Sequence, residues 1–554
     1  MRRVQRSMAV VSTAILAAGL LAACGGDGDD GDSPGGRPAG EIIVRGCNPE
    51  NPLVPGNTAE TCGGNVLDVT TAKLIKYNNE DASPEMDIAE SIETTDNQNF
   101  TVKIKPDYMF SDGTPVTAES FVKSWNYTAY GPNGYQGSYF FAPVQGFADL
   151  QCTGEDPEDP CAGGEPAAQE MSGLKVVDDT TFTITTSEKV SNLPVRLGYT
   201  AFAPMPDVFF EDPESFGTAG TKPVSAGPYT VDTFTQNEEI VLVKNPEYSG
   251  DLAQEPDKIN FRLYTDPAAA YTDLVDGGID IDDDIPLNVL QDDLWLDELE
   301  NRGLSQEQGV ISLMGMDPVV DPRLENPDVR KAISMAVDRE TITQEILAGT
   351  ATPATGWVSP IVDGFKEGQC GDACTYDPEA AKQLLEDAGG WDASQGDLTL
   401  SYNADSDHAA WVEAACNSIR QALGIECKPN SYVDFAAMLT DLGEKKLKGM
   451  FRYGWQMDYP SIENFLVPIY TKGASSNYFS FDNPTFDDLN RQAAAAEDLE
   501  TANGLYQQAE LELAKDMRVI PMWVSLGQVG WSDRVDNVQL NAFGVPVYNE
   551  ITTN

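Results

Sequence analysis

Basic residues and histidine are scarce in this sequence. Its 554 residues include 35 Lys or Arg, 89 Asp or Glu and 1 His, which gives a formal net charge of −54 at pH 7. Binding of nucleic acid depends on Lys and Arg that displace counterions from phosphates, so this balance argues against nucleic acid as a partner. A single imidazole, at His408, excludes a His-rich zinc or nickel site. His408 begins an apolar-periodic segment, and we expect a surface residue at a helix N-terminus.

The abundant acid is interpreted as a solvated, self-repelling surface rather than as a specific acidic function. The densest run is "DIDDDIP" at 280–286. Its spacing lacks the turn glycine and the terminal glutamate of an EF-hand loop, so we expect solvated carboxylates there and no calcium. The sequence therefore predicts no metal site and no cofactor.

The N-terminus carries targeting signals. A basic segment, "MRRVQRS", precedes the apolar run "MAVVSTAILAAGLL" at 8–21, which is short for a membrane span, and this predicts a signal peptide over 1–23. The following "LAAC" and a Gly/Asp/Pro/Ser tract resemble a bacterial lipobox, with a lipid on the sulfur of Cys24 and a flexible tether over 24–40. An ordinary cleavage site beside an incidental Cys is the alternative. We expect a lipid-anchored protein at the extracytoplasmic face of the bacterial cell membrane.

Setting Cys24 aside leaves eight of the nine cysteines, an even number suited to an oxidising compartment. They lie in couples that are close in sequence, and we expect four short-loop disulfides, although long-range pairings remain open. The expected couples are Cys47 with Cys62, Cys152 with Cys161, Cys370 with Cys374, and Cys416 with Cys427. A metal site at "CGDAC" would need a second ligand pair nearby, and the sequence offers none.

Strands and helices alternate after the tether, without a linker or an internal repeat. Strand patterns at 398–402, 425–428 and 448–455 alternate with two amphipathic helices, the first of which ends at Gly424. This order predicts a β-α-β-α-β unit with parallel strands. Ligands of open α/β sheets bind outside the carboxyl ends of the strands, so Asp458, in "GWQMDY" just after the last strand, is placed at a ligand edge. Further strands are expected at 100–104, 181–186, 240–243 and 259–264, and further helices after the N-caps Thr117, Asn326 and Asp377.

Six segments, taken in order, closely resemble the oligopeptide/dipeptide-binding (peptide/nickel/opine) family of extracellular solute-binding proteins of ABC importers. Agreement in order is more specific than any single match. The segments are "FSDGTPVTAESFVKSWNY", "KPVSAGPYTV" with "EEIVLVKNPEYSG", "DLVDGGIDI", "NPDVRKAISMAVDRETI", "YDPEAAKQLLEDAGGW", and the stretch from "NYFSFDNPTF" to "RVIPMW".

The resemblance implies an α/β, two-lobed periplasmic-binding-protein-like fold (type II, cluster C) with hinge strands and an extra subdomain inserted in lobe I. We expect lobe I at 41–305, with the inserted subdomain at about 85–190, lobe II at 306–524, and a return to lobe I at 525–554. The region from 48 to 78 resembles the family only loosely, so no ligand residue is assigned in lobe I.

The resemblance also assigns roles within "FRYGWQMDY". Asp458 corresponds to an aspartate that receives the α-ammonium of a peptide, with Trp455 and Tyr459 as aromatic neighbours. Arg452 corresponds to an arginine that can meet a C-terminal carboxylate, but strand alternation puts it on the face opposite Trp455, and a structural ion pair is the alternative. For Asp458 the alternative is an Asp that caps a turn before "YPS".

Tyr135 and Tyr139, in "YGPNGYQGSYFF", are candidates for lining the cleft, although a packed or surface loop is favoured. The expected function is an extracytoplasmic binding lipoprotein, monomeric and not an enzyme, that delivers short peptides to an ABC permease. An oligosaccharide or a metal chelate is the alternative ligand. A carboxylate-pair hydrolase using Asp458 and Glu463 has no support beyond the abundance of acid.

Overall fold

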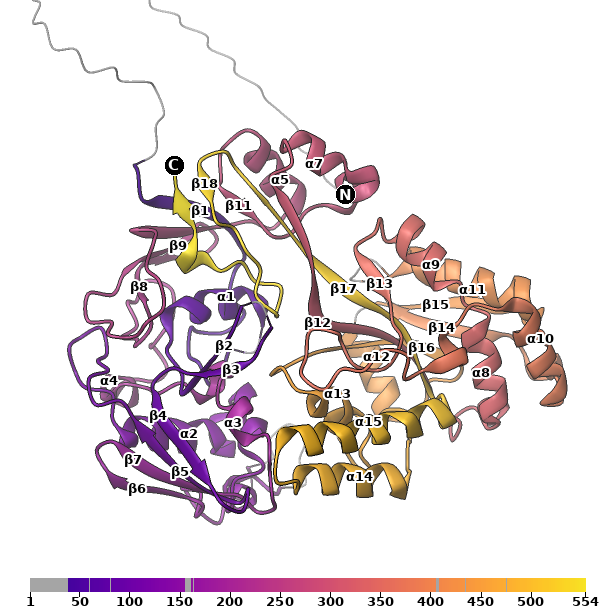
Figure 1. Ribbon diagram of the computed structural model, residues 1–554, viewed down its shortest axis with the longest axis horizontal. Coiled ribbons are helices and arrows are strands. Elements are labelled where there is room, and N and C mark those ends of the chain that lie inside the picture. The colour runs from indigo at the N-terminus through magenta and orange to yellow at the C-terminus, as the bar shows by residue number, and fades with distance from the viewer. Residues whose placement is uncertain are drawn as a thin grey trace, which may run out of the picture. The chain divides into compact units, whose positions relative to one another are not determined.

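The structure is a computed structural model that describes residues 38–554, except 59, 80, 155–160, 163, 405–407, 434 and 475 (Figure 1). Residues 39–554 form one compact unit. The expected signal peptide and Cys24 lie outside the described residues. Within the described part of the chain, no helix is long and apolar enough to cross a membrane.

The largest sheet has eleven strands and runs through most of the unit. Ten of them follow the order β15-β14-β16-β12-β17-β11-β1-β10-β9-β8, and β13 pairs with β17 beside this path. Parallel and antiparallel pairs are mixed, since β14 is parallel to β15 and β16 while β12 is antiparallel to β16 and β17. The strands are β1 (Glu41–Gly46), β8 (Tyr229–Thr235), β9 (Glu239–Lys244), β10 (Lys258–Leu263), β11 (Ile281–Asp282), β12 (Gly303–Met316), β13 (Ala351–Pro353), β14 (Leu398–Asn403), β15 (Cys427–Tyr432), β16 (Met450–Gln456) and β17 (Val519–Trp531).

The predicted β-α-β-α-β unit is confirmed as β14, α11 (Ala409–Leu423), β15, α12 (Phe435–Gly443) and β16. The first helix ends where expected, because Gly424 adopts the left-handed conformation (φ 67°) that closes a helix without the strain of a side chain. β14 lies between its two parallel partners, so the carboxyl ends of all three strands meet at one edge. The chain leaves β16 at that edge and continues into Met457 and Asp458.

Two long strands connect the two halves of the sheet. β12 and β17 pair along most of their length and lie side by side in Figure 1. Ile311 and Ile520 belong to the apolar core of the second half of the chain, whereas Val529 belongs to a core built with β1, β8, β9 and β10. Their register breaks between Glu307 and Ile311 and shifts again between Ser312 and Leu313, so the pairing is irregular at two points.

A second, smaller sheet has the antiparallel order β4-β5-β7-β6. Its strands are β4 (Ala89–Thr94), β5 (Asn99–Ile104), β6 (Leu174–Asp178) and β7 (Thr181–Thr185). α2 (Ala118–Ala129) packs against it, begins at the expected cap Thr117 and forms a capping box with Ser120. Trp125 and Phe182 are fully buried in the separate core that α2 and this sheet enclose.

The predicted caps Asn326 and Asp377 are also confirmed, because their side chains accept hydrogen bonds from the backbone N–H groups of Asp328 and Ala380.

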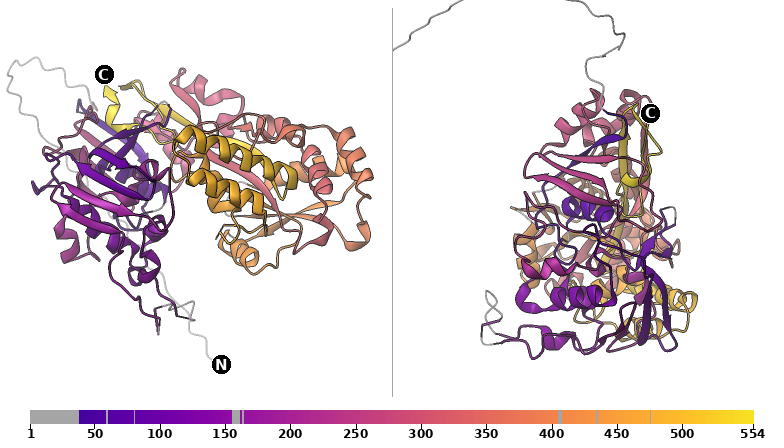
Figure 2. Two further views of the ribbon diagram at one scale, coloured as in Figure 1. Left: turned by 60° about the horizontal axis from the view of Figure 1, so that its bottom comes forward. Right: turned by 90° about the vertical axis from the view of Figure 1, so that its left-hand side faces the viewer.

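α14 (Pro484–Ala494) and α15 (Leu499–Asp516) pack side by side (Figure 2). The other helices and strands are α1 (Thr61–Thr70), α3 (Leu193–Arg196), α4 (Asp207–Glu211), α5 (Pro267–Val275), α6 (Leu287–Leu290), α7 (Leu294–Glu298), α8 (Pro327–Met335), α9 (Arg339–Thr341), α10 (Pro378–Asp387), α13 (Ile462–Tyr470), β2 (Ile75–Tyr77), β3 (Pro84–Met86), β18 (Val535–Asp536) and β19 (Thr552–Thr553).

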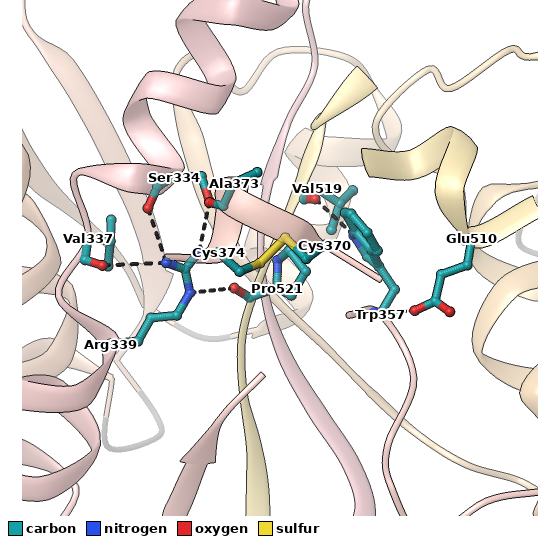
Figure 3. Close-up of a disulfide and its surroundings, with 10 residues drawn as sticks. All are labelled: Ser334, Val337, Arg339, Trp357, Cys370, Ala373, Cys374, Glu510, Val519 and Pro521. Carbon is teal, nitrogen blue, oxygen red and sulfur yellow. Dashed lines mark hydrogen bonds between the residues drawn. A yellow bond between two sulfur atoms is a disulfide. The ribbon is translucent and has the colours of Figure 1, made fainter. Parts of the chain in front are cut away.

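Four disulfides join the couples that are close in sequence: Cys47–Cys62, Cys152–Cys161, Cys370–Cys374 and Cys416–Cys427. Cys370–Cys374 lies beside a buried polar network (Figure 3). There Arg339 donates to the carbonyl of Pro521 at 2.8 Å and to the hydroxyl of Ser334 at 2.8 Å, and that hydroxyl donates to Ala373.

Glu510, on α15, is a second buried polar group in this region (Figure 3). Its side chain is 1% exposed, and Oε1 accepts the backbone N–H of Trp357 at 2.8 Å. Oε2 accepts no hydrogen bond from the described residues. Burial raises the pKa of Glu510 to about 7.

The prediction of solvated acid at 280–286 is wrong. Asp280 and Asp282 are fully buried, because β11 lies between β1 and β17 in the middle of the large sheet. Asp280 accepts hydrogen bonds from the backbone of Ile43 at 2.9 Å, the hydroxyl of Ser532 at 2.9 Å and the guanidinium of Arg534 at 3.2 Å. A local run of Asp is therefore buried where partners distant in the sequence supply donors.

Candidate ligand-binding site

A cavity of 620 Å³, here called the main cavity, lies at the carboxyl end of β16. That end contributes Gln456, Met457 and Asp458, and β12 contributes Gln308 and Val310 at its register break. Charged and aromatic residues from the N-terminal half of the chain and its last residues complete much of the wall. They include Arg45, Glu60, Asp68, Lys73, Tyr77, Tyr199, Asp283, Asp284 and Phe543. Since most ligand cavities measure about 300–1,000 Å³, the volume suits a small molecule or a short peptide.

Asp458 is held in one orientation by Asn464, a residue of α13 that is 1% exposed. The backbone N–H of Asp458 donates to Asn464 Oδ1 at 2.9 Å, and Asn464 Nδ2 donates to Asp458 Oδ2 at 3.0 Å. Trp455 Nε1 donates to the same Asn464 Oδ1 at 3.1 Å. The other carboxylate oxygen, Oδ1, accepts the hydroxyl of Tyr139 at 3.2 Å.

The surroundings of Asp458 shift the pKa of its carboxyl group toward neutral pH. Burial raises the pKa of Asp458 to about 6; hydrogen bonds from Asn464 and Tyr139 oppose this rise, the nearby Glu463 adds to it, and Arg196 lowers the pKa. Asp458 is therefore mainly ionised at pH 7. A cation bound beside it would stabilise the ionised form further.

Tyr459 and Glu463 belong to a buried cluster that we call the latch, together with Asn192 and Arg196 from the segment that contains α3. Glu463 Oε2 accepts from Tyr459 Oη at 2.7 Å and from Asn192 Nδ2 at 2.8 Å, and lies 3.1 Å from the guanidinium of Arg196. That guanidinium is also 5.2 Å from the centroid of the Tyr459 ring. Tyr459 is thus buried in the latch and does not line the main cavity. Glu463, which is 3% exposed, is engaged in structural contacts rather than facing a substrate as a hydrolase would require.

Arg452 lies elsewhere. Its guanidinium is 4.7 Å from the centroid of the Phe435 ring, its Nε donates to His408 Nε2 at 2.9 Å, and it does not line the main cavity. Its contact with a ligand carboxylate stays a prediction that this placement does not favour. His408 precedes α11 as expected but is only partly exposed, because it packs between Arg452 and Trp411. The expectation of a plain surface residue is wrong in that respect.

The tyrosines of the 130–141 loop divide between two roles. Tyr135 packs edge-on against Tyr127, with ring centroids 5.4 Å apart, as favoured from the sequence. Tyr139 is 55% exposed, in line with the favoured surface loop, but sequence reasoning missed the hydrogen bond from its hydroxyl to Asp458. Sequence reasoning also missed Tyr77, Tyr199 and Phe543. No local motif marks these residues, which reach the main cavity only through tertiary contacts.

Metal ligands are not gathered at this site. Within the part of the chain that could be searched, no group of three or more His, Cys, Asp or Glu is placed to hold an ion. The polar groups that line the main cavity offer hydrogen bonds and charge to a ligand. Among these groups, Asp458 is oriented by its hydrogen bonds with Asn464.

The chain matches known proteins in sequence. The family model for bacterial extracellular solute-binding proteins, family 5 (middle), matches residues 83–477. The periplasmic oligopeptide-binding protein OppA of Escherichia coli (strain K12) is 26% identical over 466 residues, which cover 80% of this chain and 79% of that protein. The oligopeptide-binding protein OppA of Bacillus subtilis (strain 168) is 24% identical over 530 residues, or 94% of each chain.

A solved structure agrees in fold. Haemophilus influenzae OppA in complex with RPPGFSPFR superimposes with a TM-score of 0.71 at 20% identity, covering 93% of this chain and 99% of that one. The expected type II periplasmic-binding-protein fold is confirmed. With the family model covering most of its length, the chain belongs to family 5 of the bacterial extracellular solute-binding proteins.

Proposed function

We propose that this chain is the extracytoplasmic substrate-binding component of an ABC importer, and that it captures short peptides in the main cavity with the peptide α-ammonium at Asp458. The observation that carries the proposal is the arrangement of Asp458: Asn464 fixes one carboxylate oxygen, and the carboxylate lines a cavity of 620 Å³. The names of the two OppA relatives support a peptide as the ligand.

The chemistry suits an ammonium group. A charge-assisted hydrogen bond between a carboxylate and an ammonium is worth about 1.5–3 kcal/mol, and more where water is excluded. Asp458 Oδ1 accepts only the partly exposed Tyr139 hydroxyl among the described residues, which leaves acceptor capacity for a ligand N–H. Backbone groups of an extended peptide can pair with the protein as an added strand, which leaves its side chains in tolerant pockets.

The same proposal includes the wider organisation of the protein. Lobe I is taken as 41–305 with 525–554, lobe II as 306–524, and the inserted subdomain as about 85–190. β12 and β17, which contribute to both apolar cores, serve as hinge strands, and bound peptide favours closure through contacts made only in the closed form. A lipid on Cys24 anchors a monomer to the membrane, where it presents peptide to a permease.

The test is calorimetric titration of the purified full-length chain with a mixture of tripeptides and with single tripeptides. We expect Asp458→Asn to weaken peptide binding by about 2–5 kcal/mol, a loss of roughly thirtyfold to several thousandfold, because the ammonium loses its charged partner. The matched control is Asp392→Asn, which removes one exposed carboxylate from a turn outside the main cavity. Its affinity should equal that of the wild type.

Two outcomes would contradict the proposal at different levels. Equal binding of N-acetylated and free-amine peptides would remove the ammonium assignment. Binding of an oligosaccharide or a metal chelate in the same titration, with no binding of any peptide, would replace the ligand class.

A further inference from the structure

The wall of the main cavity carries more negative than positive charge. Among the described residues, five carboxylates line it, together with two basic side chains, Arg45 and Lys73. The carboxylates are Glu60, Asp68, Asp283, Asp284 and Asp458. A ligand α-ammonium at Asp458 would balance one of them, so the wall remains acidic even with the amino terminus of a peptide in place.

Both basic side chains are already engaged by the protein. Arg45 NH2 lies 2.5 Å from Asp284 Oδ2, and Arg45 NH1 lies 3.6 Å from Asp283 Oδ1. Lys73 Nζ lies 3.4 Å from Asp68 Oδ1. A carboxylate on the ligand would therefore compete with Asp68 for Lys73 and with Asp283 and Asp284 for Arg45.

Asp283 is a largely buried carboxylate with incomplete hydrogen bonding. Its side chain is 10% exposed and lines the main cavity, yet Oδ1 accepts no hydrogen bond from any described residue. One guanidinium, that of Arg45, serves both Asp283 and Asp284, so this pair of carboxylates keeps an uncompensated negative charge. Burial raises the pKa of Asp283, which is the cost of holding such a charge away from water.

Glu60 binds backbone N–H groups rather than a basic side chain. It caps the N-terminus of α1, where both of its carboxylate oxygens lie 3.0 Å from the backbone N of Gly63. The helix N-terminus offsets part of its charge. The negative charge that lacks a cationic partner therefore lies mainly at Asp283 and Asp284.

We propose that the main cavity selects peptides with a Lys or Arg side chain, that this side chain binds against Asp283 and Asp284, and that no cation of the cavity pairs with the C-terminal carboxylate of the peptide. The inference rests on the proposed function, since it takes the ligand to be a peptide with its amino terminus at Asp458. A basic side chain supplies the missing positive charge to the pair and N–H donors to Asp284, whose side chain is the more exposed of the two. An acidic side chain meets repulsion there, which excludes it.

The experiment titrates the full chain with tetraalanine peptides in which one of positions 2 to 4 is replaced by Lys, norleucine or Glu. Norleucine keeps the length of the Lys side chain without its charge. At the position that reaches Asp283, we expect the Lys peptide to bind about tenfold tighter than the norleucine peptide and the Glu peptide to bind more weakly than both. The C-terminal amide of the Lys peptide should bind at least as tightly as its free acid.

Two variants locate the effect. Asp284→Asn, whose side chain is 45% exposed, and Asp283→Asn should each shrink the Lys preference while retaining the binding of the norleucine peptide. Asp392→Asn is the control and should leave the preference unchanged. If Asp283→Asn unfolds because Arg45 loses a partner, Asp284→Asn carries the test alone.

The outcomes separate the two proposals. Equal affinities for Lys, norleucine and Glu at all positions, or an unchanged Lys preference in Asp284→Asn, would overturn the basic-peptide inference and leave peptide capture intact. Tighter binding of the free acid than of the amide would overturn the statement about the C-terminal carboxylate. Absence of binding by every peptide would overturn the proposed function and this inference with it.

Discussion

At the residue scale, one asparagine determines how Asp458 can act. Asn464 Oδ1 faces two N–H donors, the backbone of Asp458 and the indole of Trp455, so its Nδ2 is left to face the Asp458 carboxylate. The amide orientation follows from this network. One carboxylate oxygen therefore accepts from the buried Asn464, and the other accepts from the exposed Tyr139.

The pKa of Asp458 makes a prediction about peptide affinity. Its pKa is about 6 without ligand, and a bound ammonium lowers it, so binding releases protons from the fraction that is protonated. Affinity should be constant near pH 7 and fall by up to about tenfold per unit as the pH drops below 6, since protonated Asp458 must first ionise. Above about pH 8 it should fall again as the peptide amine loses its proton.

Calorimetric titration with one tripeptide from pH 5 to pH 9 would test this profile. Asp458→Asn is the control: its acid limb should be flat, and the alkaline limb should be weaker because no carboxylate remains to attract the ammonium. A wild-type affinity that does not change between pH 5 and pH 7 would contradict the assignment.

At the scale of elements, the latch joins α3 to α13, the helix that carries Asn464. In Arg196→Met the apolar stem is kept but Glu463 is left buried without its cation. We expect a loss of about 3–5 kcal/mol in the free energy of unfolding, because an unpaired buried charge is costly, and weaker peptide binding because the contact between α3 and α13 is lost.

The matched control is the double variant Arg196→Met with Glu463→Gln. Glutamine keeps an oxygen that can accept the hydrogen bonds of Asn192 and Tyr459 and removes the charge. It should therefore recover much of the stability lost in the single variant, measured by urea unfolding. Strictly additive losses would show that the ion pair is not what the latch depends on.

The elements that the sequence predicts well are those with local signals. The unit from β14 to β16 follows from apolar periodicity and from Gly424, and Asp458 follows from its place after β16 together with the family resemblance. No local signal predicts the contact of Tyr139 with Asp458 or the place of Asp283 in the cavity wall. Tyr139 lies 319 residues from Asp458 along the chain, and Asp283 reaches the main cavity only because β11 lies between β1 and β17.

At the scale of the whole molecule, the many carboxyl groups make the stability of the fold depend on pH. Burial raises the pKa of Asp282 and of Glu510 to about 7 each. A folded-state pKa above the unfolded value contributes stability that is fully present below about pH 4 and is lost as the pH rises through 7. The net charge of −54 adds repulsion that also grows with pH. We expect the melting temperature to be higher at pH 5 than at pH 8, by scanning calorimetry.

Salt distinguishes the effect of buried carboxyl groups from that of repulsion between exposed ones. At 1 M salt the screening length is about 3 Å, which suppresses repulsion between exposed carboxylates but hardly affects buried groups. High salt should therefore remove only part of the difference between pH 5 and pH 8, and Glu510→Gln should remove a further part. A melting temperature that rises from pH 5 to pH 8 at low salt would contradict this account.

The register break between β12 and β17 has a mechanical consequence. Between Glu307 and Ile311 the two strands do not follow regular pairing, and Gln308 and Val310 from this stretch line the main cavity. A bulged strand bends there more easily than a regular ladder does. In the hinge that we propose, a molecule held in the main cavity contacts β12 where the strand bends, so its contacts bear directly on the angle between the lobes.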